Sequence, residues 1–136
     1  MPALKSLTLI LTISLFSVVS IAELSPETVA GAKSVDGKQA KMLFNSGALF
    51  VDTRSNSDWE AGRIPSAVHL ELKAVYSEAT LSAEATKNEA IVIYCNGTSC
   101  LRSAAATAKA VEWGFTNLYY YRLGYPDWKS HRYPTE

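Results

Sequence analysis

Short apolar runs of strand length recur along the chain, and segments of helical or turn character separate them. The run at residues 48–52 has no polar alternation, which fits a strand covered on both faces, as in a parallel sheet. The run at residues 90–94 is strongly β-forming and is the expected central strand. Further strands are predicted at residues 32–35, 67–70 and 117–121.

Helices are expected between these strands. Asp36 fits the N-cap of a helix that runs through residues 41–44 and stops at residues 45–47. The other helices are predicted at residues 55–61, capped by Ser55, at residues 81–87, and at residues 102–113, closed by Gly114. The alternation predicts an α/β sandwich with a mostly parallel sheet and helices on both faces. Sheets of this kind bind ligands at the carboxyl ends of their strands.

The first 22 residues have the pattern of a secretory signal peptide. Lys5 supplies one positive charge, and residues 7–22 contain no charged side chain. Ser20 and Ala22 are the small residues that a signal peptidase reads, so we expect cleavage after Ala22. An uncleaved anchor is less favoured, because a membrane span needs about 20 apolar residues. We therefore expect a periplasmic or otherwise exported protein.

The rest of the chain has the length of one domain. We expect an N-terminal extension at residues 23–33 and the domain itself at residues 34–136. The 13 Lys and Arg residues are interspersed with 13 Asp and Glu residues, so we predict neither a nucleic-acid partner nor membrane binding after signal cleavage. His69 and His131 have no metal-ligand partner at useful spacing, so they are interpreted as a satisfied strand histidine and a solvated one. No metal or other cofactor is predicted.

The strand at residues 90–94 ends at Cys95, where a small polar loop leads into an alanine-rich helix. A cysteine is nucleophilic as its thiolate, and a helix N-terminus with a nearby arginine lowers its pKa. Gly97 can adopt positive φ, so that the N–H groups of the turn point inward and hold an anion. Arg102 can fork two hydrogen bonds to an anionic oxygen pair, and Ser103 can donate one more. A buried, inert thiol is the less favoured interpretation.

Cys100 lies in the same loop. Two thiols close in sequence can pair in an oxidising compartment. A disulfide across so short a loop gives little entropic stabilisation, so a purely structural role is poorly motivated. Cys100 can instead attack a Cys95 persulfide or sulfenate, which releases sulfide or water and leaves a Cys95–Cys100 disulfide. A reductant would then be required.

Four motifs together resemble a single-domain rhodanese: residues 51–54, 62–68, 95–103 and 124–128. Their order and spacing agree with that family, and the resemblance spans residues 34–136. The resemblance implies a rhodanese-like three-layer sandwich and a thiosulfate sulfurtransferase activity.

The strand-end cysteine carries the sulfur in that family. By resemblance, Cys95 takes a sulfane sulfur from a small anionic donor such as thiosulfate, or from a persulfide, and passes it to a thiol or cyanide acceptor. Catalytic roles are expected for Cys95, Cys100 and Arg102. Substrate-binding roles are expected for Asn96, Gly97, Thr98, Ser99, Leu101 and Ser103. Supporting structural roles are expected for Asp52, Arg54, Asp58 and Trp128, with Arg54 paired to Asp58 or Glu60 and Trp128 packed as a core aromatic.

The loop departs from the common family pattern, in which arginine follows the cysteine by five residues instead of the seven found here. Paired loop cysteines are similar to those of some exported rhodanese-like proteins, some of them linked with quinone-cofactor alcohol oxidation, although Leu101 stands where that subgroup typically has tryptophan. A second hypothesis is a non-enzymatic redox or partner-binding domain that uses a Cys95/Cys100 dithiol–disulfide pair with an exported thiol–disulfide partner. A cysteine phosphatase or arsenate reductase is a weaker third, because those enzymes usually need a neighbouring acid, and sequence alone does not place Asp127 near the loop.

Overall fold

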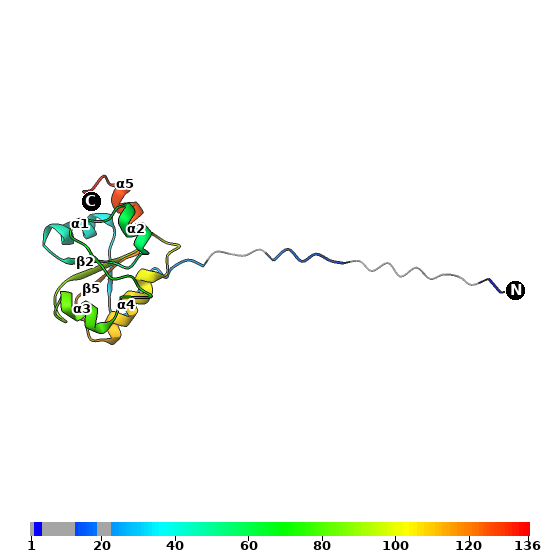
Figure 1. The fold of residues 1–136 in the computed structure, drawn as a ribbon, viewed down its shortest axis with the longest axis horizontal. Helices are drawn as coiled ribbons and strands as arrows, with labels where there is room; N and C mark the ends of the chain where they lie inside the picture. Colours follow the sequence, from blue (N-terminus) through cyan, green and yellow to red (C-terminus); the bar gives the residue numbers. More distant parts are fainter. Residues whose placement is uncertain (1, 4–12, 19–22) are drawn as a thin grey trace.

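Five strands form one sheet in the order β1-β5-β4-β2-β3, and every pairing between neighbours is parallel. The strands are β1 (Lys33–Ser34), β2 (Leu49–Asp52), β3 (Val68–His69), β4 (Ile91–Tyr94) and β5 (Leu118–Tyr121). The computed structural model describes residues 2–3, 13–18 and 23–136 (Figure 1). Each predicted strand is present, and the predicted parallel sheet is confirmed.

The predicted signal peptide lies largely outside the described residues, which omit 1, 4–12 and 19–22, and so does its cleavage site after Ala22. Residues 13–18 have no regular secondary structure. In the part of the chain that the structure describes, no helix is both long and apolar enough to cross a bilayer. Signal cleavage and the boundaries at residues 23–33 and 34–136 therefore stay predictions.

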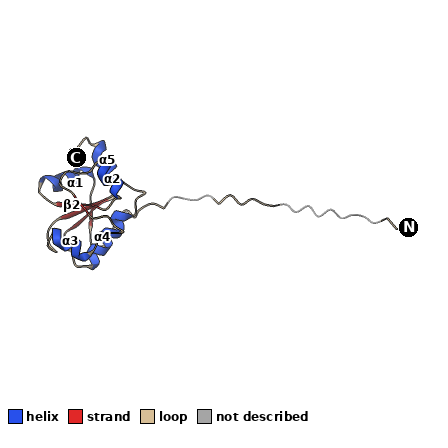
Figure 2. Ribbon diagram, viewed as in Figure 1, coloured by secondary structure: helices blue, strands red, loops and turns tan. Residues whose placement is uncertain are grey.

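Helices cover both faces of the sheet (Figure 2). They are α1 (Gly37–Asn45), α2 (Asn56–Ala61), α3 (Glu78–Glu84), α4 (Arg102–Glu112) and α5 (Gly124–Ser130). The first two and α5 lie on one side of the sheet, and α3 and α4 lie on the other (Figures 1 and 2). The predicted α/β sandwich of three layers is confirmed.

Two helices differ from the prediction. The helix expected at residues 81–87 is α3, which begins earlier because Ser77 caps it: the Ser77 hydroxyl accepts from the Thr80 N–H at 3.1 Å, and the Thr80 hydroxyl accepts from the Ser77 N–H at 2.9 Å. The other is α5, which was not predicted because Gly124 and Pro126 are typical of turns. Pro126 is tolerated there because N–H groups in the first helical turn have no intrahelical acceptor.

The sheet separates two apolar clusters. Successive residues of β4 alternate between them: Ile91 and Ile93 pack with the cluster under α3 and α4, and Val92 and Tyr94 pack with the cluster under α1 and α5. Trp128 belongs to the second cluster and is fully buried, as predicted for a core aromatic. Apolar burial on both faces explains why β4 reads as an uninterrupted apolar run.

The register between β2 and β4 decides which polar residues meet beyond the sheet. Asp52 pairs with Tyr94, so residues 53–54 and 95–96 leave the sheet side by side at its carboxyl edge. Thr53 ties the two strand ends together, because its N–H and its hydroxyl both donate to the Tyr94 carbonyl, at 3.3 and 3.0 Å. The Cys95 loop therefore starts from a fixed point.

Candidate active site

A disulfide joins Cys95 to Cys100, with their Cα atoms 6.3 Å apart. Cys95 is fully buried at the end of β4, whereas Cys100 is partly exposed. Between them, Gly97 has φ of +106°, as predicted for the turn, and its carbonyl accepts from the Cys100 N–H at 3.0 Å. Both cysteines thus lie in one short loop at the carboxyl edge of the sheet.

The motif at residues 124–128 packs directly on this loop. The Tyr125 N–H donates to the Cys95 carbonyl at 2.9 Å. Gly124 lies so close to the same carbonyl that any Cβ at this position would overlap it, and its φ of +62° also favours glycine. Glycine at residue 124 is therefore what lets the start of α5 fix the position of Cys95.

Arg54 connects β2 with the loop and is only 2% exposed. Its guanidinium binds the Asp52 carboxylate through Nε and Nη2, at 3.0 and 2.7 Å, and Nη2 also donates to the Gly62 carbonyl at 2.7 Å. Burial alone would lower the pKa of Arg54, but the hydrogen bonds and charge of Asp52 outweigh it, so that the pKa is raised. The predicted pairing of Arg54 with Asp58 or Glu60 is wrong, because Asp52 occupies the guanidinium.

Asn96 is held from both sides. Its side-chain oxygen accepts from Arg54 Nη1 at 3.3 Å, and its side-chain N–H donates to the Asp58 carboxylate at 2.8 Å. The hydrogen bond from Asn96, together with one from Ser55, keeps the pKa of Asp58 below its usual value. Asp58 therefore supports the loop through Asn96 rather than through Arg54.

Arg102, the predicted anion ligand, is engaged by protein groups. Its guanidinium donates to the Thr53 carbonyl at 3.3 Å and forms an ion pair with Glu71, which is 8% exposed. The hydrogen bond from Arg102 lowers the pKa of Glu71, against the opposing effect of burial. Sequence reasoning missed Glu71; its one signal is an acidic residue directly after the predicted strand at residues 67–70. Direct anion binding by Arg102 stays a prediction.

The N-terminal segment also reaches the loop, through Ser25, which is 3% exposed. The Ser25 N–H and hydroxyl both donate to the Thr98 carbonyl at 2.8 Å. Arg122, just after β5, donates to the Ser25 carbonyl from Nη2 at 2.8 Å and to the Ser25 hydroxyl from Nε at 3.2 Å. We call Ser25 and Arg122 the clamp; no sequence motif pointed to either residue.

Replacing Ser25 with alanine is expected to lower the free energy of unfolding by about 1–2 kcal/mol, because its hydroxyl loses two partly buried hydrogen bonds, one donated to Thr98 and one accepted from Arg122. Urea unfolding measures the loss. Ser130→Ala is the matched control, since the exposed Ser130 hydroxyl also donates to a carbonyl, that of Asp127, at 2.7 Å. We expect the control to change stability by less than about 0.5 kcal/mol. Equal effects of the two substitutions would contradict the role of the clamp.

Several hydrogen-bond donors of the loop have no acceptor among the described residues. These donors are the backbone N–H groups of Asn96, Gly97, Thr98 and Ser99. Ser103, the second residue of α4, adds a fully buried hydroxyl without a hydrogen-bond partner. Together with the positive N-terminal end of α4, such donors stabilise an anionic sulfur or a small oxyanion.

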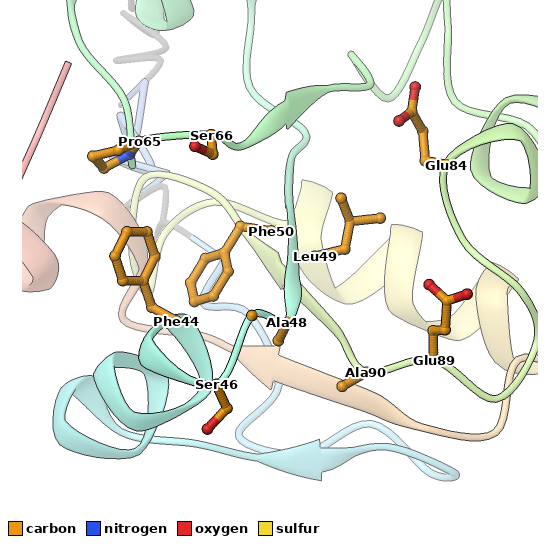
Figure 3. A pocket seen from close by; sticks show the side chains of 11 residues that line it. Phe44, Ser46, Ala48, Leu49, Phe50, Pro65, Ser66, Glu84, Glu89 and Ala90 are labelled. Carbon is orange, nitrogen blue, oxygen red and sulfur yellow. The ribbon is translucent and has the colours of Figure 1, made fainter.

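A cavity of about 630 Å³ lies at the opposite edge of the sheet. Leu49 and Ala90, at the amino ends of β2 and β4, line it together with Phe44 and two carboxylates, Glu84 and Glu89 (Figure 3). Because Cys95 follows the carboxyl end of β4, this cavity takes no part in the chemistry of the loop.

The fold and the strand-end cysteine define a rhodanese-like protein, and the comparison with known families agrees. The model of the Rhodanese-like domain matches residues 36–131, so the chain belongs to this family. Among its relatives, the thiosulfate sulfurtransferase GlpE of Pseudomonas syringae pv. syringae (strain B728a) is 32% identical over 105 residues, covering 76% of this chain and 92% of that protein. GlpE of Pseudomonas entomophila (strain L48) is 34% identical, covering 76% and 90%.

Solved structures share the fold. The BH2092 protein from Bacillus halodurans superposes with a TM-score of 0.68 at 22% identity, and the match covers 77% of each chain. The Alr3790 protein from Anabaena sp. superposes with a TM-score of 0.65 at 22% identity, covering 75% of this chain and 90% of that chain. The predicted family and the rhodanese-like fold are confirmed.

Proposed function

We propose that the protein is an exported sulfurtransferase that carries a sulfane sulfur on Cys95. The observation that carries the proposal is the position of Cys95, which is buried at a strand end and begins a loop whose N–H groups at residues 96–99 have no acceptor among the described residues. Burial alone raises the pKa of a thiol, but donors around it favour the thiolate, which is the nucleophilic form. The sulfurtransferase relatives support the same reaction class.

The reaction has two steps. The Cys95 thiolate attacks the outer sulfur of thiosulfate, the sulfur–sulfur bond of the donor breaks, and sulfite leaves with the electron pair. A cyanide or thiolate acceptor then attacks the terminal sulfur of the Cys95 persulfide and regenerates the thiolate. The loop N–H groups that have no acceptor among the described residues would hold the anionic donor and then the persulfide.

The disulfide adds a requirement, because a sulfur bonded to Cys100 cannot act as a thiolate. We therefore expect thiosulfate-dependent thiocyanate formation from protein that has been reduced with dithiothreitol and then freed of it. The oxidised protein should turn over at least about 100-fold more slowly. Titration of two free thiols controls for complete reduction. A fully reduced, folded protein without thiocyanate formation would contradict the proposed activity.

The disulfide also favours a second candidate function, a redox or partner-binding domain that exchanges the Cys95–Cys100 pair with another exported protein. Thiol titration of freshly isolated protein separates the two. A fully oxidised pair, combined with no sulfur transfer after reduction, supports the second candidate.

A further inference from the structure

We propose that an external thiol opens the disulfide by attacking the Cys100 sulfur, so that Cys95 leaves as the thiolate. The inference rests on the proposed function only where it treats the freed Cys95 as the sulfur carrier. The direction of opening itself follows from the different exposure of the two cysteines and from the hydrogen-bond donors in the residues that follow Cys95.

Access differs sharply between the two cysteines. Cys95 is fully buried, and its neighbours Tyr94 and Gly97 are buried as well. Cys100 is partly exposed, and the residue that follows it, Leu101, is 41% exposed. Thiol–disulfide exchange needs the attacking sulfur to approach one of the two disulfide sulfurs directly, and access decides which one it reaches.

The clamp helps to keep Cys95 covered. Ser25 donates twice to the Thr98 carbonyl, and Tyr125 donates to the Cys95 carbonyl, so that the loop is fixed at both points. In the disulfide form, the loop cannot rearrange to expose Cys95 to an external thiol without breaking these hydrogen bonds. Cys100 makes a single backbone hydrogen bond within the loop, to Gly97.

Cys95 is also suited to be the leaving group. A thiol that leaves as a stabilised thiolate leaves faster. The N–H groups of residues 96–99 and the buried hydroxyl of Ser103 have no hydrogen-bond partner in the described structure, and they belong to the loop and the first helical turn that directly follow Cys95. Ser103 is the second residue of α4, and the loop that starts at the carboxyl end of β4 leads directly into this helix, so Ser103 lies at the end of α4 that adjoins the loop.

The exchange then balances as follows. The thiolate R–S⁻ bonds to Cys100 Sγ, the Cys95–Cys100 bond breaks, and Cys95 keeps the electron pair. A second thiolate attacks the sulfur of R, which releases the Cys100 thiolate and forms a disulfide between the two external thiols. Those two thiols are oxidised by two electrons in total, and the protein disulfide is reduced. The partner is thus a thiol or dithiol reductant that reaches the exposed side of the loop.

Glutathione tests the direction of attack on the oxidised full chain. The reaction is stopped in acid within its earliest phase, and free thiols are then labelled with N-ethylmaleimide. Trypsin releases both cysteines in one peptide, residues 88–102, because cleavage follows Lys87 and Arg102. Tandem mass spectrometry then locates each label. We expect glutathione on Cys100 with N-ethylmaleimide on Cys95, about tenfold or more above the reverse arrangement.

Sulfite is a second, independent probe of the disulfide, and it gives the direction of attack even if the glutathione adduct decays before it is trapped. Sulfite attacks one disulfide sulfur and marks it as an S-sulfonate, and again we expect the mark on Cys100. The matched control is the oxidised chain in urea, where both sulfurs are exposed and the labels should distribute almost evenly. Labels mainly on Cys95 in the folded chain, or the same distribution folded and unfolded, would overturn the proposal. Sulfur transfer by the chemically reduced protein is measured separately, so failure of either proposal leaves the other intact.

Discussion

The Cys95→Ser variant is expected to lose thiosulfate-dependent thiocyanate formation by about 10³-fold or more, because a serine hydroxyl can neither form a persulfide nor act as a comparable nucleophile. The fold should remain, since serine is similar in size and the loop keeps the Tyr125, Ser25 and Arg54 contacts. Far-UV circular dichroism and urea unfolding establish that the variant is folded.

Cys100→Ser is the matched control in the same loop. It leaves Cys95 without a disulfide partner, so we expect turnover within about tenfold of the reduced parent and no dependence on prior reduction. An equal loss in both variants would indicate that the pair acts together as a redox couple. Retained turnover in Cys95→Ser would exclude Cys95 as the sulfur carrier.

Arg54→Ala is expected to lower the free energy of unfolding by about 3–5 kcal/mol, because it leaves the fully buried Asp52 carboxylate without its countercharge. That loss is a large part of the roughly 5–15 kcal/mol that stabilises a typical domain. The variant also loses the hydrogen bonds to Gly62 and Asn96, so the loop should loosen together with the fold.

Urea unfolding of four proteins tests the pair: the parent, Arg54→Ala, Asp52→Ala and the double variant. If the two charges interact, the double variant loses less stability than the sum of the single variants. Arg63→Ala is the control, because Arg63 is an arginine that is partly exposed. Its guanidinium carbon lies 4.5 Å from the centroid of the Trp59 ring, and its Nε lies 3.4 Å from the Glu136 carboxylate. We expect that control to cost about 1 kcal/mol or less. Strict additivity of the Asp52 and Arg54 effects would contradict the buried pair.

Local sequence rules predicted those features of the site that depend on residues adjacent in the sequence. The apolar run at residues 90–94 placed Cys95 at a strand end, and Gly97 adopts the positive φ expected of the turn. His69 is a satisfied strand histidine, with its ring nitrogen 2.8 Å from the Arg54 carbonyl. The alternation of strands and helices along the sequence was enough to predict the layers of the fold.

The missed contacts depend on the tertiary fold. Ser25 and Thr98 are 73 positions apart, and the Glu71–Arg102 pair spans 31, so no local pattern connects them. Arg54 was assigned a partner on the following helix, but a carboxylate two residues earlier, at the buried strand end, holds it instead. Burial decides which carboxylate pairs with an arginine, because an unpaired charge inside the fold is far more costly than one at the surface.

The central claim is that Cys95, once reduced, carries a sulfane sulfur. Intact-mass measurement of the reduced protein after brief exposure to thiosulfate tests this claim most directly, with peptide mapping to locate the added atom. We predict a gain of one sulfur atom on Cys95 in the parent and in Cys100→Ser, and none in Cys95→Ser. No gain of mass in the reduced parent, or a sulfur mapped to Cys100, would contradict it.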